Sequence, residues 1–571
     1  MIDKIWRYKD TKISDAVAVK MSRDLKIPRI IAKVLLNRGI NSDGAMDFIK
    51  KSMQGVINPM LLTDMDKAVN RILLALKNNE QITVYGDYDV DGITSTAMVY
   101  EFLKEHGANV SYYIPARADE GYGINIMAVN KLRKSGTKLL ITVDCGITAI
   151  GEVEFARLQG MDVIITDHHT CKERLPEAAA AIINPKRPDS DYPFDALAGV
   201  GVAFKLILAL TMALKESTNE CFSKYVDIVA IGTIADVVSL TGENRIIVDR
   251  GLISLKNTQR PGLIAIKEVS GADQKPINAT VVAFAIAPRL NAAGRLGTAT
   301  TAVELLLTKD IDRAREIAAE LDNENRERQE TEQEIFAEAL DMISKDANFD
   351  KKKVIVLAHE DWHGGVIGIV ASRLCERYYK PCILISHSNG IGKGSGRSIK
   401  GFNLFDALSY CEDCLTEFGG HSVAAGLNVN MSDLDRFITK INKYADGVLT
   451  PDLMVPSVDI DCKISPDEAT LENARLISSL EPFGMGNEKP IFSLEGVTVS
   501  DIATIGNDNK HLRMRFMTSS GVLNAIGFGF GAAAEKFKVS DCVDVAFTLD
   551  INNYNNKNYL QLVIKDIKCS E

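Results

Sequence analysis

The sequence predicts an α/β protein: a parallel-sheet domain, a long helix leading to a smaller α/β domain, and a C-terminal β-barrel. Three observations support this. After residue 80, short β-rich apolar runs alternate with helical patterns, as in βαβ units. The stretch 322–334 has no apolar residue inside a long helical pattern. After Pro451 the composition turns β-rich. With 571 residues, the chain has room for about three or four domains.

Composition is that of an ordinary globular protein, with 46% hydrophobic and 25% charged residues. No apolar run approaches the roughly 20 residues of a membrane span, and the first ten residues lack the apolar core of a signal peptide. The ten cysteines show no disulfide framework, which favours a reducing, cytoplasmic setting. Cys411 and Cys414 form a lone CxxC pair without a second pair to complete a zinc site, so we expect a structural role for them.

The formal net charge of −10 argues against a protein that coats nucleic acid through charge alone. The stretch 373–400 departs from this balance, because Glu376 is its only acid. Such a basic segment could bind phosphates, and it could equally be a solvated helix face. Its basic residues are Arg373, Arg377, Lys380, Lys393, Arg397 and Lys400.

The pattern of predicted elements divides the chain into five segments. Short helices are expected at the N-terminus, followed by the βαβ series, the long helix, the second α/β domain and the barrel. At 1.5 Å per residue, the long helix, 310–344, would span on the order of 50 Å, and a helix polar all round usually bridges two domains. The five segments are residues 1–50, 51–308, 309–346, 347–448 and 449–571.

Three aspartates follow the first predicted strand of the βαβ series. The strand begins at Ile82, and Asp87, Asp89 and Asp91 come directly after it at alternate positions. Three carboxylates so close together repel one another, and a cation or a proton must neutralise them if they are buried. The alternative is a solvated acidic turn. The glycines on both sides favour close approach of the backbone to a ligand.

Two later strands also end in acids. The run 138–143 stops at Asp144, and the run 162–166 stops at Asp167, His168 and His169. Parallel strands place their carboxyl ends on one edge of the sheet, so we expect these side chains to converge there. Asp236 lies in a largely apolar stretch, where an ionised carboxylate needs a partner.

These acids predict a site for two divalent cations. Asp89, Asp91, Asp144 and Asp236 together carry four negative charges, which two such ions would balance. His168 adds an imidazole ligand, and mixed carboxylate and imidazole ligation suits Mn²⁺ somewhat better than Mg²⁺. A pair of ions about 3.5 to 4 Å apart is a known arrangement for hydrolysing phosphate esters.

Four motifs in this order resemble those of the DHH phosphoesterase superfamily, and their surroundings are similar to those of its RecJ-like exonucleases. The resemblance extends from about residue 50 to the C-terminus. The motifs are GDYDVDG at 86–92, VDCG at 143–146, DHH at 167–169 and IADVV at 234–238.

The resemblance implies roles for individual residues. Asp144 would be the bridge between two ions, and Asp87 and His169 would be catalytic, as groups that orient other residues or transfer protons. Tyr85 stands where many superfamily members have a histidine, which implies one ligand fewer for the first ion. The implied metal ligands are Asp89, Asp91, Asp144, His168 and Asp236.

Two further segments of the first domain are candidates for contact with DNA. Arg117 lies in a glycine-punctuated loop and could bind a phosphate, although most such arginines are simply exposed. The stretch 288–297, PRLNAAGRLG, could let a nucleic-acid backbone pass closely, or could be a helix packed through its alanines. In RecJ-like enzymes it borders the DNA path, which implies contacts from Arg289, Asn291 and Arg295.

The second α/β domain resembles the DHH-associated substrate-binding domain. KGSGRS at 393–398 offers amides, hydroxyls and a guanidinium in what we predict to be a flexible loop, and anions suit such loops. By resemblance, Ser395 and Arg397 would bind a 5′ phosphate. His363, in EDWHGG, and His421, in GGHS, would face the scissile phosphate and count as catalytic.

The C-terminal segment predicts a small barrel, and the resemblance implies an oligonucleotide-binding (OB) fold. Phe483, in the loop before the main strands, and His511 could stack on bases or could be ordinary packing residues. The predicted strands are 455–460, 491–499, 511–517, 522–528, 543–550 and 559–567.

Together, these features predict a metal-dependent exonuclease on single-stranded DNA, with Mn²⁺ or Mg²⁺ as cofactor. The resemblance implies 5′ to 3′ polarity, release of 5′-mononucleotides and a place in DNA recombination and repair. A single-strand-binding protein and a RecQ-type helicase are the candidate partners, with no membrane association. One alternative is a phosphodiesterase for very short oligonucleotides or cyclic dinucleotides, against which the barrel and long helix argue. The other is a catalytically silent DNA-binding scaffold, against which the intact acids argue.

Overall fold

The structure, a computed structural model, describes residues 4–9, 14–116, 120, 123–555 and 557–570. The chain forms two compact units, each assembled from separate stretches of sequence. Unit 1 comprises Met1–Ile40, Arg326–Ser478 and Pro490–Glu571, and unit 2 comprises Asn41–Asn325 and Ser479–Lys489.

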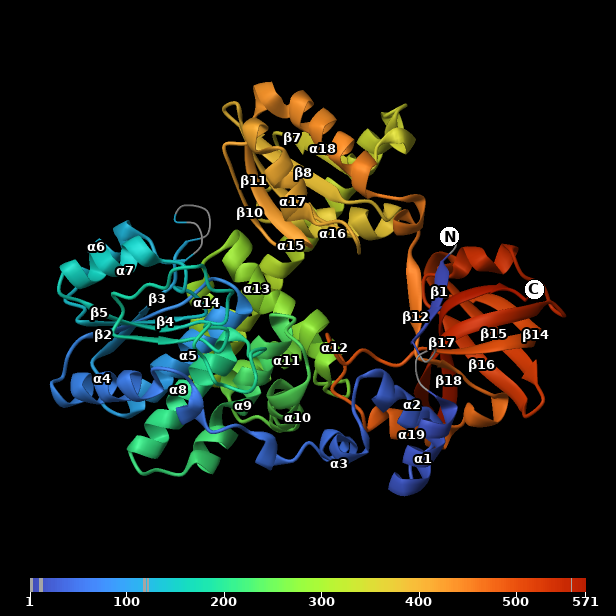
Figure 1. Ribbon diagram of the computed structural model, residues 1–571, viewed down its shortest axis with the longest axis horizontal. Helices are drawn as coiled ribbons and strands as arrows, with labels where there is room; N and C mark the ends of the chain where they lie inside the picture. The colour runs from blue at the N-terminus through green and yellow to red at the C-terminus, as the bar shows by residue number, and fades with distance from the viewer. Residues whose placement is uncertain (1–3, 10–13, 117–119, 121–122, 556, 571) are drawn as a thin grey trace. The chain divides into compact units, whose positions relative to one another are not determined.

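A five-stranded parallel sheet forms the centre of unit 2 (Figure 1). The strand order β3-β2-β4-β5-β6 reverses direction between β2 and β4, as in doubly wound α/β folds. Ligands bind at the carboxyl ends of the strands beside such a reversal, so the topology alone marks the edge that carries Asp87 and Asp144. The strands are β2 (Ile82–Tyr85), β3 (Val110–Tyr113), β4 (Leu139–Val143), β5 (Asp162–Thr166) and β6 (Ala181–Ile183).

Helices cover both faces of this sheet, which explains why its strands read as continuous apolar runs. One face packs on α6 (Ile126–Lys134) and α7 (Ile150–Leu158). The other packs on α4 (Met65–Lys77), α5 (Val90–Glu105) and α8 (Gly199–Ala213). Figure 1 shows the two groups of helices on opposite sides of the strands.

A third apolar cluster joins α5 to the helical part of unit 2. A short π-helical stretch, Val282–Ile286, lies directly before α13. The helices of unit 2 outside the sheet layers are α3 (Ser42–Lys50), α9 (Thr218–Ala235), α10 (Gly242–Lys256), α11 (Pro261–Ser270), α12 (Ala279–Val281), α13 (Ala287–Leu296) and α14 (Ala299–Leu307).

The predicted long helix is α15, Ile311–Lys345, and the boundary between the units falls within it. Its polar middle is explained in part by ion pairs inside unit 1. Arg328 pairs with Glu332 at 2.7 Å, and Glu332 pairs with Arg373 at 2.9 Å. Polar residues of this helix therefore contact the second α/β domain rather than only solvent.

That domain contains a mixed five-stranded sheet in the order β10-β11-β9-β8-β7. Residues 393–397 of the KGSGRS segment lie in β9, which is paired on both sides, so the predicted flexible loop is wrong. Cys411 and Cys414 are buried just after α17, where Cys411 precedes a short 3-10 helix, Glu412–Cys414. The elements are β7 (Ile355–His359), α16 (Ile367–Tyr378), β8 (Cys382–Ser388), β9 (Ile391–Arg397), α17 (Leu404–Tyr410), β10 (Glu417–Gly420), β11 (Ala424–Asn430) and α18 (Leu434–Val448).

The C-terminal segment forms a closed five-stranded barrel, which confirms the predicted fold. The order β14-β15-β16-β18-β17 closes through pairing of β17 with β14, and no edge of the barrel is left open there. The elements after α18 are β12 (Ser457–Ile460), β13 (Cys462–Lys463), α19 (Leu471–Ser478), β14 (Phe492–Ile505), β15 (His511–Thr518), β16 (Gly521–Gly527), β17 (Cys542–Tyr554) and β18 (Lys557–Cys569).

The N-terminal segment contains a strand that the helical prediction missed. β1 (Ile5–Tyr8) pairs in parallel with β12, and Trp6 and Tyr8 pack against Val458 and Ile460. The helices α1 (Asp15–Leu25) and α2 (Arg29–Asn37) follow it.

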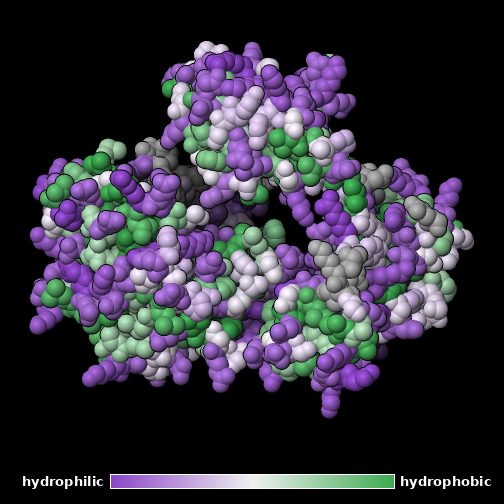
Figure 2. All heavy atoms as spheres, in the orientation of Figure 1, coloured by the Kyte–Doolittle hydropathy of each residue, from purple (hydrophilic) through white to green (hydrophobic). Residues whose placement is uncertain are grey.

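On the face drawn in Figure 2, hydrophilic residues cover most of the area and hydrophobic residues lie in small separate groups. Among the described residues, no helix combines the length and apolarity that crossing a membrane demands.

Candidate metal centre

The predicted acids of unit 2 meet at the carboxyl edge of the parallel sheet. Asp87 and Asp89 follow β2, Asp144 follows β4, and His168 follows β5. Asp89 is also the N-cap of α5, where its side chain accepts a hydrogen bond from the Gly92 N–H at 3.0 Å. The strand ends thus bring together residues that are about 80 positions apart in the sequence, as the parallel topology requires.

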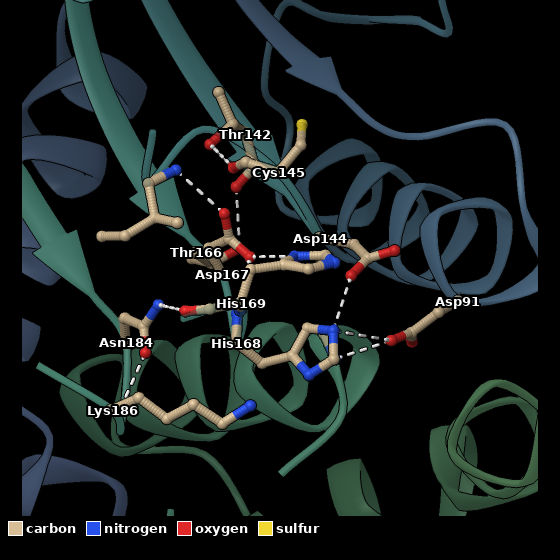
Figure 3. A network of polar contacts seen from close by, with 12 residues as sticks. Asp91, Thr142, Asp144, Cys145, Thr166, Asp167, His168, His169, Asn184 and Lys186 are labelled. Carbon is tan, nitrogen blue, oxygen red and sulfur yellow. Dashed lines mark hydrogen bonds and ion pairs between the residues drawn. The ribbon is translucent and has the colours of Figure 1, made fainter. Parts of the chain in front are cut away.

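His168 lies among three carboxylates. Its Nε2 is 3.2 Å from Oδ1 of Asp144, 3.5 Å from Oδ2 of Asp236 and 3.9 Å from Oδ2 of Asp91. Figure 3 shows the imidazole pointing toward Asp144 and Asp91. Asp236 comes from the end of α9, so helix and strand ends both contribute to the cluster.

The side chains form overlapping groups in which the candidate ligand atoms all lie within 4.8 Å of one another. One group is Asp87, Asp89 and Asp144, and we call it the carboxylate set. A second is Asp91, His168 and Asp236, which we call the imidazole set. Asp144 also forms a group with His168 and His169. Asp144 therefore lies where a ligand shared by two ions would lie.

Burial leaves these polar atoms in need of a cation. Asp91 and Asp144 are 1% and 2% exposed, and His168 is 6% exposed. Among the described residues, His168 Nε2 and Asp236 Oδ2 have no hydrogen-bond partner. Buried polar atoms normally have one, so the cluster fits a divalent ion that the side chains would coordinate.

The pKa values of these side chains also show that their buried charges lack a neutralising partner. Burial, together with the neighbouring Asp89, raises the pKa of Asp91 to about 7. Burial, together with Asp91 and Asp89, raises the pKa of Asp236 to about 9, and the pKa of Asp144 is raised for the same kind of reason. Burial and the positive charge of His169 lower the pKa of His168 to about 3. A neutral imidazole is the form that binds metals.

His169 is held by Asp167, a residue that the sequence argument did not select. The His169 Nδ1 lies 2.7 Å from Asp167 Oδ1, as Figure 3 shows. The other oxygen, Asp167 Oδ2, accepts a hydrogen bond from the Ile147 N–H at 2.9 Å. Although burial opposes it, contact with Asp167 raises the pKa of His169. The position of Asp167 directly after β5 was the available signal.

Lys186 is a second residue that the sequence argument missed. Its positive charge opposes the effect of burial on the pKa of Asp236, and it also helps to lower the pKa of His168. The Lys186 backbone N–H donates to Asn184 Oδ1 at 2.8 Å, and Asn184 Nδ2 donates to the His169 carbonyl at 3.0 Å. The loop after β6 thus places a cation beside the imidazole set.

The other candidates in unit 2 lie as follows. Arg117 lies outside the described residues. Arg289, on α13, donates to Asp322 at 2.8 Å and to the Ala285 carbonyl at 2.6 Å. Asn291 and Arg295 lie on the same helix, which approaches the site: a Cβ on Gly294 would lie 2.2 Å from the Tyr88 carbonyl oxygen.

Tyr85 is buried in the core of unit 2. Its hydroxyl donates to the Gly123 carbonyl at 2.9 Å, and its ring belongs to the core under α6 and α7. Phe483, in the loop 479–489 of unit 2, lines a cavity of about 300 Å³ with residues of α10 and α12.

In unit 1, Ser395 and Arg397 lie side by side on β9. Arg397 Nη1 donates to Ser395 Oγ at 3.1 Å and to the Gly396 carbonyl at 2.7 Å. Gly368 of α16 packs closely, since a Cβ there would lie 2.8 Å from Ser395 Oγ. A hydroxyl, a guanidinium and the start of a helix therefore meet at one place, and such a group of donors suits a phosphate.

The remaining candidates of unit 1 lie in turns and in the barrel. His363 Nδ1 accepts a hydrogen bond from the Gly365 N–H at 3.1 Å, and the exposed His421 lies between β10 and β11. His511 accepts from the Gly529 N–H at 3.0 Å, and its ring contacts Phe528 edge-on.

Comparison with known proteins links all three domains to one family. The model described as "DHH family, N-terminal domain" matches residues 81–233, the DHHA1 domain matches 351–447, and the RecJ OB domain matches 460–566. The single-stranded-DNA-specific exonuclease RecJ of Bacillus subtilis is 40% identical over 96% of this chain and 69% of its own length. RecJ of Escherichia coli is 35% identical, over 95% of this chain and 96% of its own length. The structure of RecJ from Thermus thermophilus in complex with Mn²⁺ is also similar, with a TM-score of 0.84 and 30% sequence identity. The match covers 99% of this chain and 80% of the Thermus thermophilus chain.

Proposed function

This chain belongs to the RecJ family of single-stranded-DNA-specific exonucleases, and we propose that it is a metal-dependent exonuclease that hydrolyses single-stranded DNA. We further propose that it proceeds from the 5′ end, releases 5′-mononucleotides and serves DNA recombination and repair. The observation that carries the proposal is that the carboxylate set and the imidazole set lie beside each other: Asp144 of the first also forms a group with His168 of the second. An OB barrel in the same chain supports a polymeric substrate.

The cofactor in this proposal is a pair of divalent cations, Mn²⁺ or Mg²⁺, held by the two sets with Asp144 shared between them. When bound, such ions would polarise the phosphodiester as Lewis acids and would lower the pKa of a coordinated water molecule. A carboxylate oxygen of Asp87 lies within 4.8 Å of the candidate ligand atoms of Asp89 and Asp144. We therefore assign Asp87 as a metal ligand of the carboxylate set, in addition to any catalytic role.

His169 is the residue that we assign to proton transfer. Asp167 fixes the orientation of its ring through Nδ1 and keeps Nε2 available to a substrate oxygen. The His169 side chain is 37% exposed, whereas that of Asp167 is 1% exposed. In this role His169 would donate a proton to the departing 3′ oxygen, while Asp167 would remain ionised.

Substrate binding is assigned to residues of both units. Ser395 and Arg397 would bind the 5′ phosphate and set the position of the first nucleotide, and Arg117, Asn291 and Arg295 would contact the strand. Arg289 already forms an ion pair with Asp322. It would either hold α13 in position for the strand or leave Asp322 to contact a DNA phosphate. His363 and His421 remain proposed catalytic residues.

The test uses long single-stranded DNA that carries a label at its 5′ or its 3′ end. We expect cation-dependent degradation that releases the 5′ label first, as a mononucleotide. Asp144→Ala should abolish hydrolysis, because the carboxylate set loses a member and His168 of the imidazole set loses its nearest carboxylate, and should leave DNA binding measurable. The matched control is Asp162→Ala, an exposed acid at the opposite end of β5. Hydrolysis of short oligonucleotides or cyclic dinucleotides alone would contradict the proposal, and so would normal turnover by Asp144→Ala.

Location and protein partners belong to the same proposal. All ten cysteines carry free thiols, which supports a reducing, cytoplasmic setting. A single-strand-binding protein or a RecQ-type helicase is proposed as partner on family resemblance alone. Co-purification with each of these from mixtures of purified proteins would test it.

A further inference from the structure

Helix α8 begins without a capping side chain of its own. Its N-cap residue is Ala198, which has no side-chain acceptor, so the first N–H groups of the helix need a partner from elsewhere. Asp91, on α5, supplies it with both oxygens. The Gly199 N–H donates to Asp91 Oδ2 at 2.7 Å, and the Val200 N–H donates to Asp91 Oδ1 at 2.7 Å. The orientation of this carboxylate is therefore fixed by the first turn of α8.

The same turn contacts a second carboxylate. A Cβ on Gly199 would lie 2.4 Å from Asp144 Oδ1 and 2.7 Å from Asp144 Cβ. Contacts this short are not tolerated, and both partners are buried, so a side chain at position 199 must displace either Asp144 or the start of the helix. Glycine is required here for its lack of a side chain.

Asp91 and Asp144 belong to different ligand sets, and α8 lies against both. We propose that the first turn of α8 sets the separation of the two cations, with Gly199 as the positioning residue. The inference rests on the proposed function, because it concerns the same pair of cations. It adds a residue that belongs to neither ligand set and acts only through the placement of Asp91 and Asp144.

Helix α9 supports this arrangement from a third direction. A Cβ on Gly232 would lie 2.8 Å from Val200 Cγ1 and 3.2 Å from Asp91 Oδ1. α9 ends one turn later at its C-cap residue, Asp236, another member of the imidazole set. The close contact of α9 with the first turn of α8 therefore places Asp236 relative to Asp91.

The experiment compares Gly199→Ala with Gly201→Ala. Gly201 lies in the same turn, but the atoms nearest to its Cβ would be side-chain atoms of Leu197, at 3.3 Å and beyond, so this variant controls for an added methyl group. The first readout is the electron paramagnetic resonance spectrum of the Mn²⁺-loaded full chain without DNA, because coupling between two Mn²⁺ ions depends on their separation. The second is the comparison of kcat and KM on single-stranded DNA, together with DNA affinity measured in chelator.

We expect Gly199→Ala to lose the coupled spectrum and on the order of 100-fold in kcat, since small misplacements in an active site cost about that much. KM and DNA affinity in chelator should stay unchanged, and Gly201→Ala should behave like the unaltered chain. A coupled spectrum and normal kcat in Gly199→Ala would overturn the inference. Failure of the unaltered chain to bind any Mn²⁺ would overturn both the proposed function and this inference.

Thermal unfolding in chelator shows whether Gly199→Ala folds. If it does not, Val200→Pro takes its place, because proline is tolerated in the first turn of a helix and removes one of the two N–H donors to Asp91. The same loss of coupling is expected, and an unchanged coupled spectrum in this variant would overturn the inference.

Discussion

Asp91 and Asp236 are carboxyl groups that burial holds partly protonated near neutral pH. Their pKa values are about 7 and about 9, well above the ordinary value, because desolvation and neighbouring aspartates penalise the ionised form. A bound cation requires that form, so cation binding must displace protons from the imidazole set.

The affinity for Mg²⁺ should therefore rise with pH. In the metal-free protein, a carboxyl whose folded pKa is raised binds more protons than in the unfolded chain, so stability falls as pH rises from about 4 toward the folded pKa. Ligated carboxylates escape this loss. We expect the increase in melting temperature caused by Mg²⁺ to grow up to about pH 9. Asp236→Asn should remove the upper part of that dependence, and a pH-independent increase would contradict the assignment.

Lys186 is a cation placed beside a site for cations. Its charge already acts on Asp236 and His168, so it must also repel a bound ion. Lys186→Met should raise the affinity for Mn²⁺ by up to about tenfold, as measured by calorimetric titration. Lys138→Met, at the opposite end of β4, is the matched control and should leave the affinity unchanged. A weaker affinity in Lys186→Met would mean that Lys186 only supports the fold.

At the scale of elements, α8 is held by a buried ion pair as well as by Asp91. Lys205 of α8 and Glu243 of α10 are paired and fully buried. Lys205 also donates to the Ile57 carbonyl at 2.6 Å, and Tyr192 donates to Glu243 at 2.7 Å. Every polar group of this network thus has a partner, which is the condition under which burial of charge is tolerated.

Removal of one partner of this network should be costly. Lys205→Met leaves Glu243 buried without its cation, so we expect unfolding in urea to show a loss of about 3–5 kcal/mol. Lys205→Met combined with Glu243→Gln should recover part of the loss. The control, Lys67→Met, removes an exposed cation from Asp64, which keeps its ion pair with Arg187, and should change stability little. Equal effects of the two single variants would contradict the role of burial.

β9 carries the proposed phosphate pocket. Arg397→Ala should abolish the preference for a 5′-phosphorylated over a 5′-hydroxyl strand, by about tenfold or more, because a charge-assisted contact is lost. Initial rates on the two substrates measure this. Arg377→Ala, from α16 of the same basic segment, is the control. An unchanged preference in Arg397→Ala would place the pocket elsewhere.

The sequence predicted β2, β4 and β5 and their terminal acids because each strand is a buried apolar run that ends at a charge. It failed at β9, whose glycines resemble a loop. Those glycines are there to make room: Cβ atoms on Gly392, Gly394 and Gly396 would lie 2.7 to 2.9 Å from Ile385, Leu427 and Leu404. The partners come from β8, β11 and α17, which a local reading of the sequence does not include.

The residues of the site also divide into those that the sequence could identify and those that only the fold reveals. Asp89, Asp91, Asp144, His168 and Asp236 could be selected because a charge stands out in apolar surroundings. Lys186 could not, because an exposed lysine is ordinary and only the folded loop after β6 gives its charge a neighbour. Gly199 could not, because its role depends on Asp144, which α7 and β5 separate from it in the sequence.

At the scale of the whole molecule, each unit is built from distant stretches of chain. In unit 2, the loop 479–489 returns to the catalytic domain, where Lys51 donates to the Glu481 carbonyl at 3.0 Å and Leu240 to the Met485 carbonyl at 2.8 Å. In unit 1, β1 joins β12 near the barrel. Trp6 Nε1 donates to Asp566 at 2.7 Å, and its ring lies under Lys568.

Trp6 should therefore stabilise the C-terminal barrel. Trp6→Ala removes a partly buried ring and one hydrogen bond, and we expect a loss of about 2–3 kcal/mol, somewhat below that of a fully buried tryptophan. Hydrogen exchange should show faster exchange in β12 and β18 and no change in the parallel sheet. Arg7→Ala, on the exposed face of the same strand, is the control. Unaltered exchange in β18 would contradict the role of β1.

The pairing of Ile5 with Ser457 also has a consequence for the nascent chain. During synthesis at about 5–20 residues per second, the first strand leaves the ribosome tens of seconds before the partner it needs. β1 must remain without its partner strand, and must not pair with another sheet, while the parallel-sheet domain is synthesised and folds. Unit 1 is consequently completed only after the 41–325 stretch of unit 2 has been synthesised.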